Sequence, residues 1–181
     1  MTLDNMVGRG LERADSDRGE IGRYLTKIRR KLADSRKDSI SLDSRFDIAF
    51  EALLQIALVS LRANGYRTTS DAGHQQLAIQ LLPKSIGIDP SELRALNEYR
   101  KKRSTGLYEA DFDPSEDEVK AVISAVAKLL ASLTDWIKHH RPELIEDIGG
   151  PAQAAKESRA QPAQALRTAS PLRPTKPGRR R

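Results

Sequence analysis

The sequence predicts an all-α protein built as an up-down bundle of about five helices with short loops. Three observations support this class. Apolar residues recur at helical spacing over most of residues 20–148, no segment shows the alternation of a half-buried strand, and the helix-start string Asp-Pro-Ser-Glu occurs twice. One tryptophan and three phenylalanines leave the core mainly to aliphatic side chains.

The first helix is expected from about Glu20 to Ala33, and its two sides differ in character. One side is apolar and consists of Ile21, Leu25, Ile28 and Leu32. The other side is basic and includes Arg29, Arg30 and Lys31. Apolar positions that recur every three or four residues are typical of a helix with one face against a core.

The second helix is expected to begin after Ser41 or Asp43, either of which suits an N-cap, and to end before Gly65. Glu51 is the only charged residue in the long middle of this segment. A helix that exposes so little polar surface is expected at the centre of the bundle. A shorter third helix follows and is expected to end at Pro83.

Asp71 is the expected cap of that third helix. The fourth and fifth helices each follow the string Asp-Pro-Ser-Glu, at residues 89–92 and 113–116. In both strings the Asp side chain is expected to accept from the N3 amide, the Glu to reach back, and the proline to occupy N1. The fourth helix should run to about Ser104 and the fifth to about His139.

Charge is distributed unevenly along the chain. Residues 149–181 carry eight cations and one anion, a net charge of +7, whereas residues 1–148 carry 23 cations and 24 anions, a net charge of −1. Many prolines and few aliphatic residues predict that 149–181 form a disordered basic tail, which either solubilises the protein or contacts a polyanion. Residues 1–19 are expected to be flexible, which leaves residues 20–148 as one helical domain.

Composition also limits the kinds of site and location to expect. The absence of cysteine excludes disulfides and thiolate zinc sites and suits a reducing cytoplasm. No apolar run has the length of a signal-peptide core or a membrane span. His74, His139 and His140 lack metal-ligand spacing, and the last two are best explained as cations at a helix C-terminus. We expect no metal, no cofactor, no membrane contact and a cytoplasmic location.

The candidate functional site is a run of cations where the fourth helix ends. Its members are Arg100, Lys101, Lys102, Arg103 and Ser104, followed by Gly106 and Tyr108. Such a cluster suits a phosphate or an RNA backbone, and the simpler alternative is a basic helix end that complements the helix dipole. Residues five apart on an unbroken helix point about 140° from each other. Arg103 and Tyr108 should therefore meet only if Gly106 ends the helix or if two chains meet.

Three motifs occur in order along the predicted helices. They are Asn-Gly-Tyr-Arg-Thr-Thr-Ser at 64–70, Ala-Gly-His at 72–74 and Tyr-Arg-Lys-Lys-Arg-Ser-Thr-Gly-Leu-Tyr-Glu at 99–109. Together they resemble the HEPN superfamily, small helical proteins of prokaryotic conflict and toxin–antitoxin systems, over about residues 22–141. The resemblance implies a homodimer in which an arginine and a histidine from each chain face a shared cleft. Active members cleave RNA without metal, and many pair with a nucleotidyltransferase that neutralises them.

The resemblance is incomplete at the residues that would carry catalysis. It assigns Arg103 as the motif arginine, but Ser104 stands where active members have asparagine or aspartate. Tyr108 stands at the histidine position, as it does in a similar branch of the family. A phenol, with an ordinary pKa of about 10, is a poor general base at neutral pH but can donate a hydrogen bond or stack on a base. His74 would supply the missing base if the third helix reaches the cleft.

Two functions are therefore expected. The favoured one is a dimeric HEPN-type binding module, non-catalytic or weakly active, that works with RNA, a nucleotide or a partner protein of a toxin–antitoxin or defence system. The alternative is an active metal-independent ribonuclease toxin that uses Arg103, Tyr108 and His74 and is neutralised by a nucleotidyltransferase or another antitoxin. The plainest interpretation is a helical scaffold whose basic helix end only satisfies a dipole.

Overall fold

The structure, a computed structural model, is mainly helical and confirms the predicted class. It describes residues 2–69, 73–108 and 113–145, and their side chains other than those of 105–108. In chain order, the elements are the 3-10 turn η1 (Leu3–Met6), strand β1 (Leu11–Arg13), helices α1 (Arg18–Asp34) and α2 (Leu42–Ala63), strand β2 (Tyr66–Thr68), helices α3 (His74–Gln80), α4 (Leu82–Ser85), α5 (Pro90–Tyr108) and α6 (Glu116–His140), and the 3-10 turn η2 (Pro142–Leu144). The tail expected at 149–181 lies outside the described residues.

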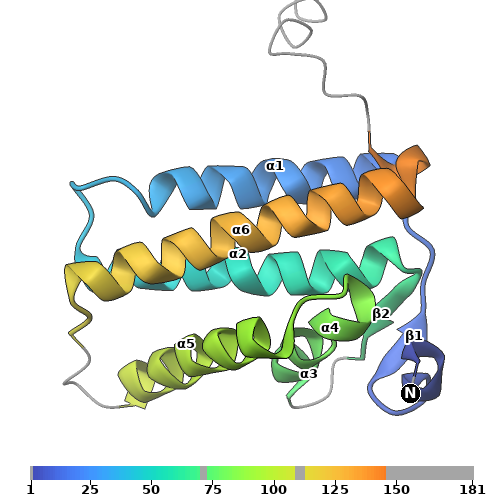
Figure 1. Cartoon of the computed structure of the whole chain (residues 1–181), viewed down its shortest axis with the longest axis horizontal. Coiled ribbons are helices and arrows are strands. Elements are labelled where there is room, and N and C mark those ends of the chain that lie inside the picture. The colour runs from blue at the N-terminus through green and yellow to red at the C-terminus, as the bar shows by residue number, and fades with distance from the viewer. Residues whose placement is uncertain (1, 70–72, 109–112, 146–181) are drawn as a thin grey trace, which may run out of the picture. The chain divides into compact units, whose positions relative to one another are not determined.

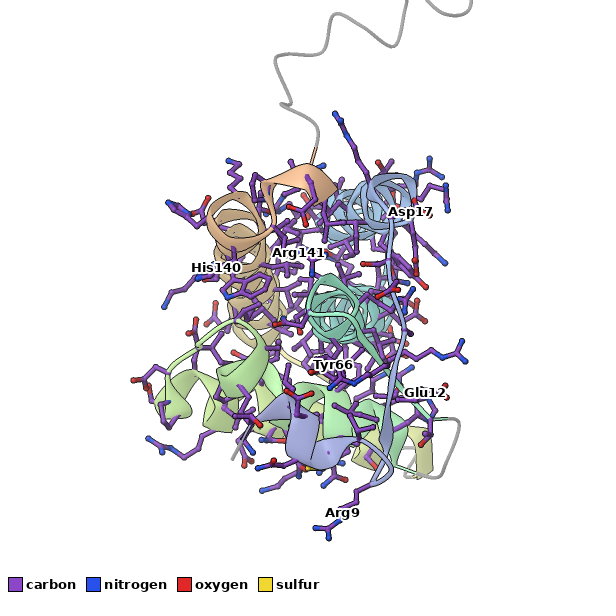
Figure 2. The ribbon with its side chains drawn as sticks, turned by 90° about the vertical axis from the view of Figure 1, so that its right-hand side faces the viewer. Arg9, Glu12, Asp17, Tyr66, His140 and Arg141 are labelled. Carbon is purple, nitrogen blue, oxygen red and sulfur yellow. The ribbon has the colours of Figure 1, made fainter. Side chains whose placement is uncertain are left out.

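Helix α2 is the centre of the bundle, as its sequence predicts. Figures 1 and 2 show α1 and α6 on one side of it and α3, α4 and α5 on the other. The four long helices alternate in direction along the chain, so the bundle is up-down (Figure 1). The fully buried large side chains of α2 are Phe46, Leu53, Ile56 and Leu61. Because α2 lies between them, α1 and α5 present their outer faces on opposite sides of the domain.

Two helix ends differ from the sequence prediction. Pro83 does not end a helix but lies in the first turn of the separate helix α4, where its missing N–H is not needed. Gly106 does not end the fourth helix, because α5 continues through it to Tyr108. A glycine inside a helix costs about 1 kcal/mol relative to alanine, which neighbouring residues can offset. The expected cap Asp71 lies outside the described residues.

The two Asp-Pro-Ser-Glu strings cap their helices differently from the prediction. In the first, Asp89 accepts from the Ser91 backbone N–H at 2.7 Å, two residues on, and Glu92 forms an ion pair with α6 instead of reaching back. In the second, the N-cap is Ser115, and Glu118 completes a capping box with it. Ser-x-x-Glu is the usual capping-box pattern, so α6 starts two residues later than the aspartate suggested.

The N-terminal segment is ordered by contacts that the sequence did not predict. Strand β1 pairs antiparallel with β2, with Leu11 opposite Thr68, although no strand was expected. Leu11 is fully buried, so residues 2–19 are a packed part of the domain and not the flexible segment that was expected. The available signal was the dipeptide Asn64-Gly65, a favoured turn pair that puts Gly65 at φ 84° directly before β2.

Arg62, near the end of α2, holds the N-terminal segment in place. Its Nε and Nη2 donate to the two carboxylate oxygens of Glu20 at 2.9 and 2.7 Å. Its Nη1 and Nη2 donate to the carbonyl oxygens of Ala14 and Asp15 at 2.9 and 2.7 Å. The Ser16 hydroxyl donates to the Arg62 carbonyl at 2.8 Å. Chiefly through the Glu20 bonds, this site raises the pKa of Arg62 and joins α1, α2 and the chain before α1.

Arg62→Gln is expected to lower the free energy of unfolding by about 2–4 kcal/mol, because it leaves a largely buried carboxylate and two carbonyls without their donor. The side chains of Arg62 and Glu20 are only 15% and 24% exposed. Urea unfolding followed by circular dichroism measures the loss. Arg67→Gln, which breaks the exposed pair with Glu12, is the matched control and should cost less than about 1 kcal/mol. Equal losses in the two variants would contradict the role of Arg62.

Candidate functional site

The predicted cation cluster lies on the second half of α5, and its members face different ways. Lys101, Lys102 and Ser104 are exposed, whereas Arg100 and Arg103 are half-buried. The cluster therefore does not form one surface of parallel cations. Each member has to be considered with the groups that it contacts.

Arg103 is turned onto α2. Its Nε lies 3.3 Å from Asp47 Oδ1, and its guanidinium carbon lies 5.1 Å from the centre of the Phe50 ring. One helical turn earlier, Tyr99 packs edge-on against Phe46 with ring centres 6.3 Å apart. A cation between a carboxylate and an aromatic face is held by both attractions. These contacts dock α5 on α2 and engage Arg103.

The two lysines of the cluster also face carboxylates. Lys101 pairs with Glu98 one turn earlier on α5 at 2.8 Å, and Lys102 pairs with Glu118 at the start of α6. Arg100 differs, because its Nε is buried and has no hydrogen-bond partner within the described part of the chain. The Nε of Arg103 likewise lacks a well-aligned hydrogen bond there, since its ion pair with Asp47 is close but poorly directed.

Helices α5 and α6 are joined by two ion pairs in register. Glu92 pairs with Lys128 at 3.3 Å, and Lys102 pairs with Glu118. On each helix the two paired residues are ten positions apart, about 15 Å along the helix axis. From one pair to the other, the residue numbers rise on α5 and fall on α6. Antiparallel α5 and α6 therefore present matching charges, and Lys102 belongs to one of the two ion pairs between them.

Tyr108 is the last residue of α5, and its side chain is outside the described residues. Because the helix is unbroken at Gly106, the geometric condition that would let Arg103 and Tyr108 meet within one chain is not met. On a continuous helix these positions lie about 140° apart. A shared site for the two residues would therefore need a second chain.

The histidines lie on other elements. His74 is the first residue of α3, which packs against both α2 and α5. His139 and His140 end α6, where each Nδ1 lies close to the carbonyl four residues earlier, at 2.7 and 2.9 Å. His140 also stacks on Trp136 with ring centres 4.7 Å apart. Within the described residues, no three His, Asp or Glu side chains form a group that could hold a metal ion.

A pocket of about 240 Å³, not predicted from the sequence, opens between α1, α2 and β2. Its lining consists of Glu20, Tyr24, Leu58, Arg62, Arg67 and Thr68. Both arginines already pair with carboxylates, Arg62 with Glu20 and Arg67 with Glu12. The pocket therefore offers an anionic ligand little positive charge that is not already compensated.

Comparisons with known proteins add no assignment. No family model matches the chain, and no curated protein or solved structure matches it either. In the described part of the chain, no helix is both long and apolar enough to cross a membrane.

The pair that joins Lys102 to Glu118 should give the fold a measurable pH dependence. The bond from Lys102, followed by that from the Ser115 backbone N–H, lowers the pKa of Glu118 from 4.5 to about 2. A carboxyl group with a depressed folded-state pKa stabilises the fold above its unfolded pKa and loses that contribution as the pH falls through the folded value. The stability difference between wild type and Glu118→Gln should therefore shrink between pH 4.5 and about 2.

Urea unfolding at a series of pH values measures this difference. Lys102→Gln is the informative second variant, because it removes the largest cause of the shift and leaves the capping box. It should move the loss of stability to higher pH. A wild-type advantage over Glu118→Gln that is constant from pH 5 to pH 2 would contradict the assignment.

Proposed function

We propose that this chain is a HEPN-type helical binding module, homodimeric and either non-catalytic or only weakly active on RNA. The observation that carries the proposal is the state of Arg103, which is held between Asp47 and the ring of Phe50. An arginine engaged in this way supports the packing of α5 on α2. It is less available for a reacting phosphate than a free guanidinium would be.

The chemistry of the second motif position supports the same proposal. In the family that the chain resembles, active members have histidine at the position of Tyr108. The phenol of a tyrosine is almost fully protonated at neutral pH. General acid–base assistance typically contributes about 10²–10⁴ to the rate of such reactions. A site with an arginine engaged elsewhere and a tyrosine in place of the base is suited to holding a ligand and not to cleaving it.

The second candidate is a metal-independent ribonuclease toxin. One contact favours it: α3, which begins at His74, packs against α5 and so brings a histidine-bearing helix to the helix of Arg103. In that case a nucleotidyltransferase or another antitoxin would be the natural partner. Either function suits a cytoplasmic location, because the cysteine-free chain needs no oxidising compartment.

Cleavage of a short single-stranded RNA in EDTA separates the two candidates. The wild type is expected to leave the RNA intact, and Arg103→Ala is expected to behave the same way. Tyr108→His restores a group that titrates near neutral pH and should raise cleavage above the wild-type baseline. Efficient wild-type cleavage that Tyr108→Phe abolishes, or growth arrest on induced expression that depends on Arg103, would replace the binding module with the ribonuclease.

The homodimer is tested by the mass in solution. Light scattering at micromolar concentration and moderate salt is expected to give twice the chain mass of 20.1 kDa. The reason is the continuous α5, on which positions 103 and 108 lie about 140° apart, so that the two residues would share a cleft only across two chains. A monomer mass would refute the dimer. So would a dimer whose interface leaves Arg103 far from the partner.

A further inference from the structure

The folded region is electrically asymmetric, although its total charge is close to zero. Residues 18–37, which contain α1, carry eight cations and two anions, a net charge of +6. Residues 1–148 as a whole carry 23 cations and 24 anions, so the rest of this region has 15 cations and 22 anions, a net charge of −7. One basic segment therefore lies on an otherwise acidic domain.

Most of this positive charge faces solvent. Five cations of the segment are exposed and have no ion-pair partner in the described part of the chain: Arg23, Lys27, Arg29, Arg30 and Arg36. Arg23, Lys27 and Arg30, which we call the α1 stripe, follow the spacing i, i+4, i+7. They lie within an arc of about 60° and about 10 Å along the helix axis. The opposite face of α1 is buried in the core.

Both anions of residues 18–37 already form ion pairs. Glu20 pairs with Arg62, and Asp34 pairs with Lys37 at 2.6 Å. Lys31, which the sequence placed on the basic side, is half-buried and pairs with Glu51 of α2. Arg30 lies within electrostatic reach of Asp34, but no residue of the α1 stripe forms an ion pair in the described part of the chain, and like charges at this spacing repel one another. An external anion would relieve that repulsion.

We infer that the exposed face of α1 binds the phosphodiester backbone of a nucleic acid. The inference rests on the proposed binding role and names its ligand and its surface. The contact with a polyanion is thus assigned to α1 and not to α5, where Lys101, Lys102 and Arg103 face carboxylates. The two helices lie on opposite sides of α2 (Figures 1 and 2). Arginine and lysine side chains in a row contact successive phosphates and release condensed counterions.

The composition of this face favours a nucleic acid over a membrane or a protein. The exposed residues of α1 from 22 to 33 are glycine, arginine, threonine, lysine and alanine only. A helix that lies in a membrane interface needs a free apolar face, and that of α1 is buried in the core. The centres of protein interfaces are rich in aromatic anchors and poor in charge, the reverse of this surface.

The test compares two variants of the full chain with equal loss of charge. The first combines Arg23→Gln, Lys27→Gln and Arg30→Gln, since glutamine keeps a high helix propensity. The control removes three exposed cations of α6 that already face carboxylates, and combines Lys120→Gln, Lys128→Gln and Lys138→Gln. The basic tail is present in both, so its contribution to binding is common to them. Circular dichroism confirms that each variant folds. If the triple α1 variant does not fold, Lys27→Gln alone takes its place in the comparison.

Fluorescence anisotropy with a labelled single-stranded RNA of about 20 nucleotides, and with DNA of the same sequence, gives the affinity between about 50 and 200 mM KCl. For whichever polymer the wild type prefers, the α1 variant should bind at least about 10-fold more weakly. Its slope of log affinity against log salt should fall by about 2, because each lost phosphate contact removes about 0.7 for a single strand. Lys27→Gln alone should remove about a third of that slope.

Three results would overturn the inference. They are equal weakening by the α1 variant and the control, unchanged binding by the α1 variant, and wild-type binding to vesicles of anionic lipid but to neither nucleic acid. The same mixtures of protein and RNA also test the proposed function, by showing whether the wild type cleaves the RNA. Efficient wild-type cleavage of the RNA would refute a non-catalytic role, whereas loss of binding in the α1 variant would still locate the surface on α1.

Discussion

The burial of most of α2 is the constraint on which the rest of the structure depends. Its fully buried large side chains, from Phe46 to Leu61, are covered by several helices and not by one neighbour. The chain therefore has to bring α1 and α6 to one side and α3, α4 and α5 to the other (Figure 2). This arrangement separates the outer face of α1 from that of α5, so that the two basic segments cannot form one surface.

The two basic segments differ in how their charge is compensated. On α5 the cations meet carboxylates of α2, α5 and α6, and Arg103 contributes to the packing of α5 on α2. On α1 the cations of the stripe form no ion pair among the described residues, and Asp34, the acid that Arg30 influences, is paired with Lys37. A cationic run in a sequence thus has two physical outcomes. Which of them applies is decided by the acids that neighbouring helices bring to it.

The sequence predicted the helices well because their signals are local. Periodic apolar residues located α1, α2 and α6 within a few residues, and the lack of charge in the middle of α2 predicted its central position. Two kinds of feature were missed. Strand β1 is only three residues long and is held by a partner more than 50 residues away, so no local pattern marks it. The continuation of α5 through Gly106 depends on its packing and not on the propensity of one glycine.

The candidate site was predicted only in part, for a similar reason. The cluster at residues 100–104 does lie on one helix, but its pairing with Asp47 and Glu118 involves residues distant in the sequence. The basic side of α1 was visible in Arg29 and Arg30, yet its significance depends on which of its cations form ion pairs in the folded chain. The pocket between α1, α2 and β2 is assembled from three elements, and no motif marks such a place.

The bonds of Arg62 have a consequence for how the domain opens. They join residues 42 and 48 positions apart, so they close a long loop and can form only after α1 has packed on α2. The chain before α1 is held by these bonds, by the burial of Leu11 and by the bond from the Tyr66 hydroxyl to Asp4 at 2.7 Å. This segment and the sheet of β1 and β2 should therefore detach together while the helical core stays folded, as a cooperative unit of intermediate stability. The backbone amides of β1 would then exchange with deuterated solvent in a single event, at a free energy to which a side chain outside the sheet contributes.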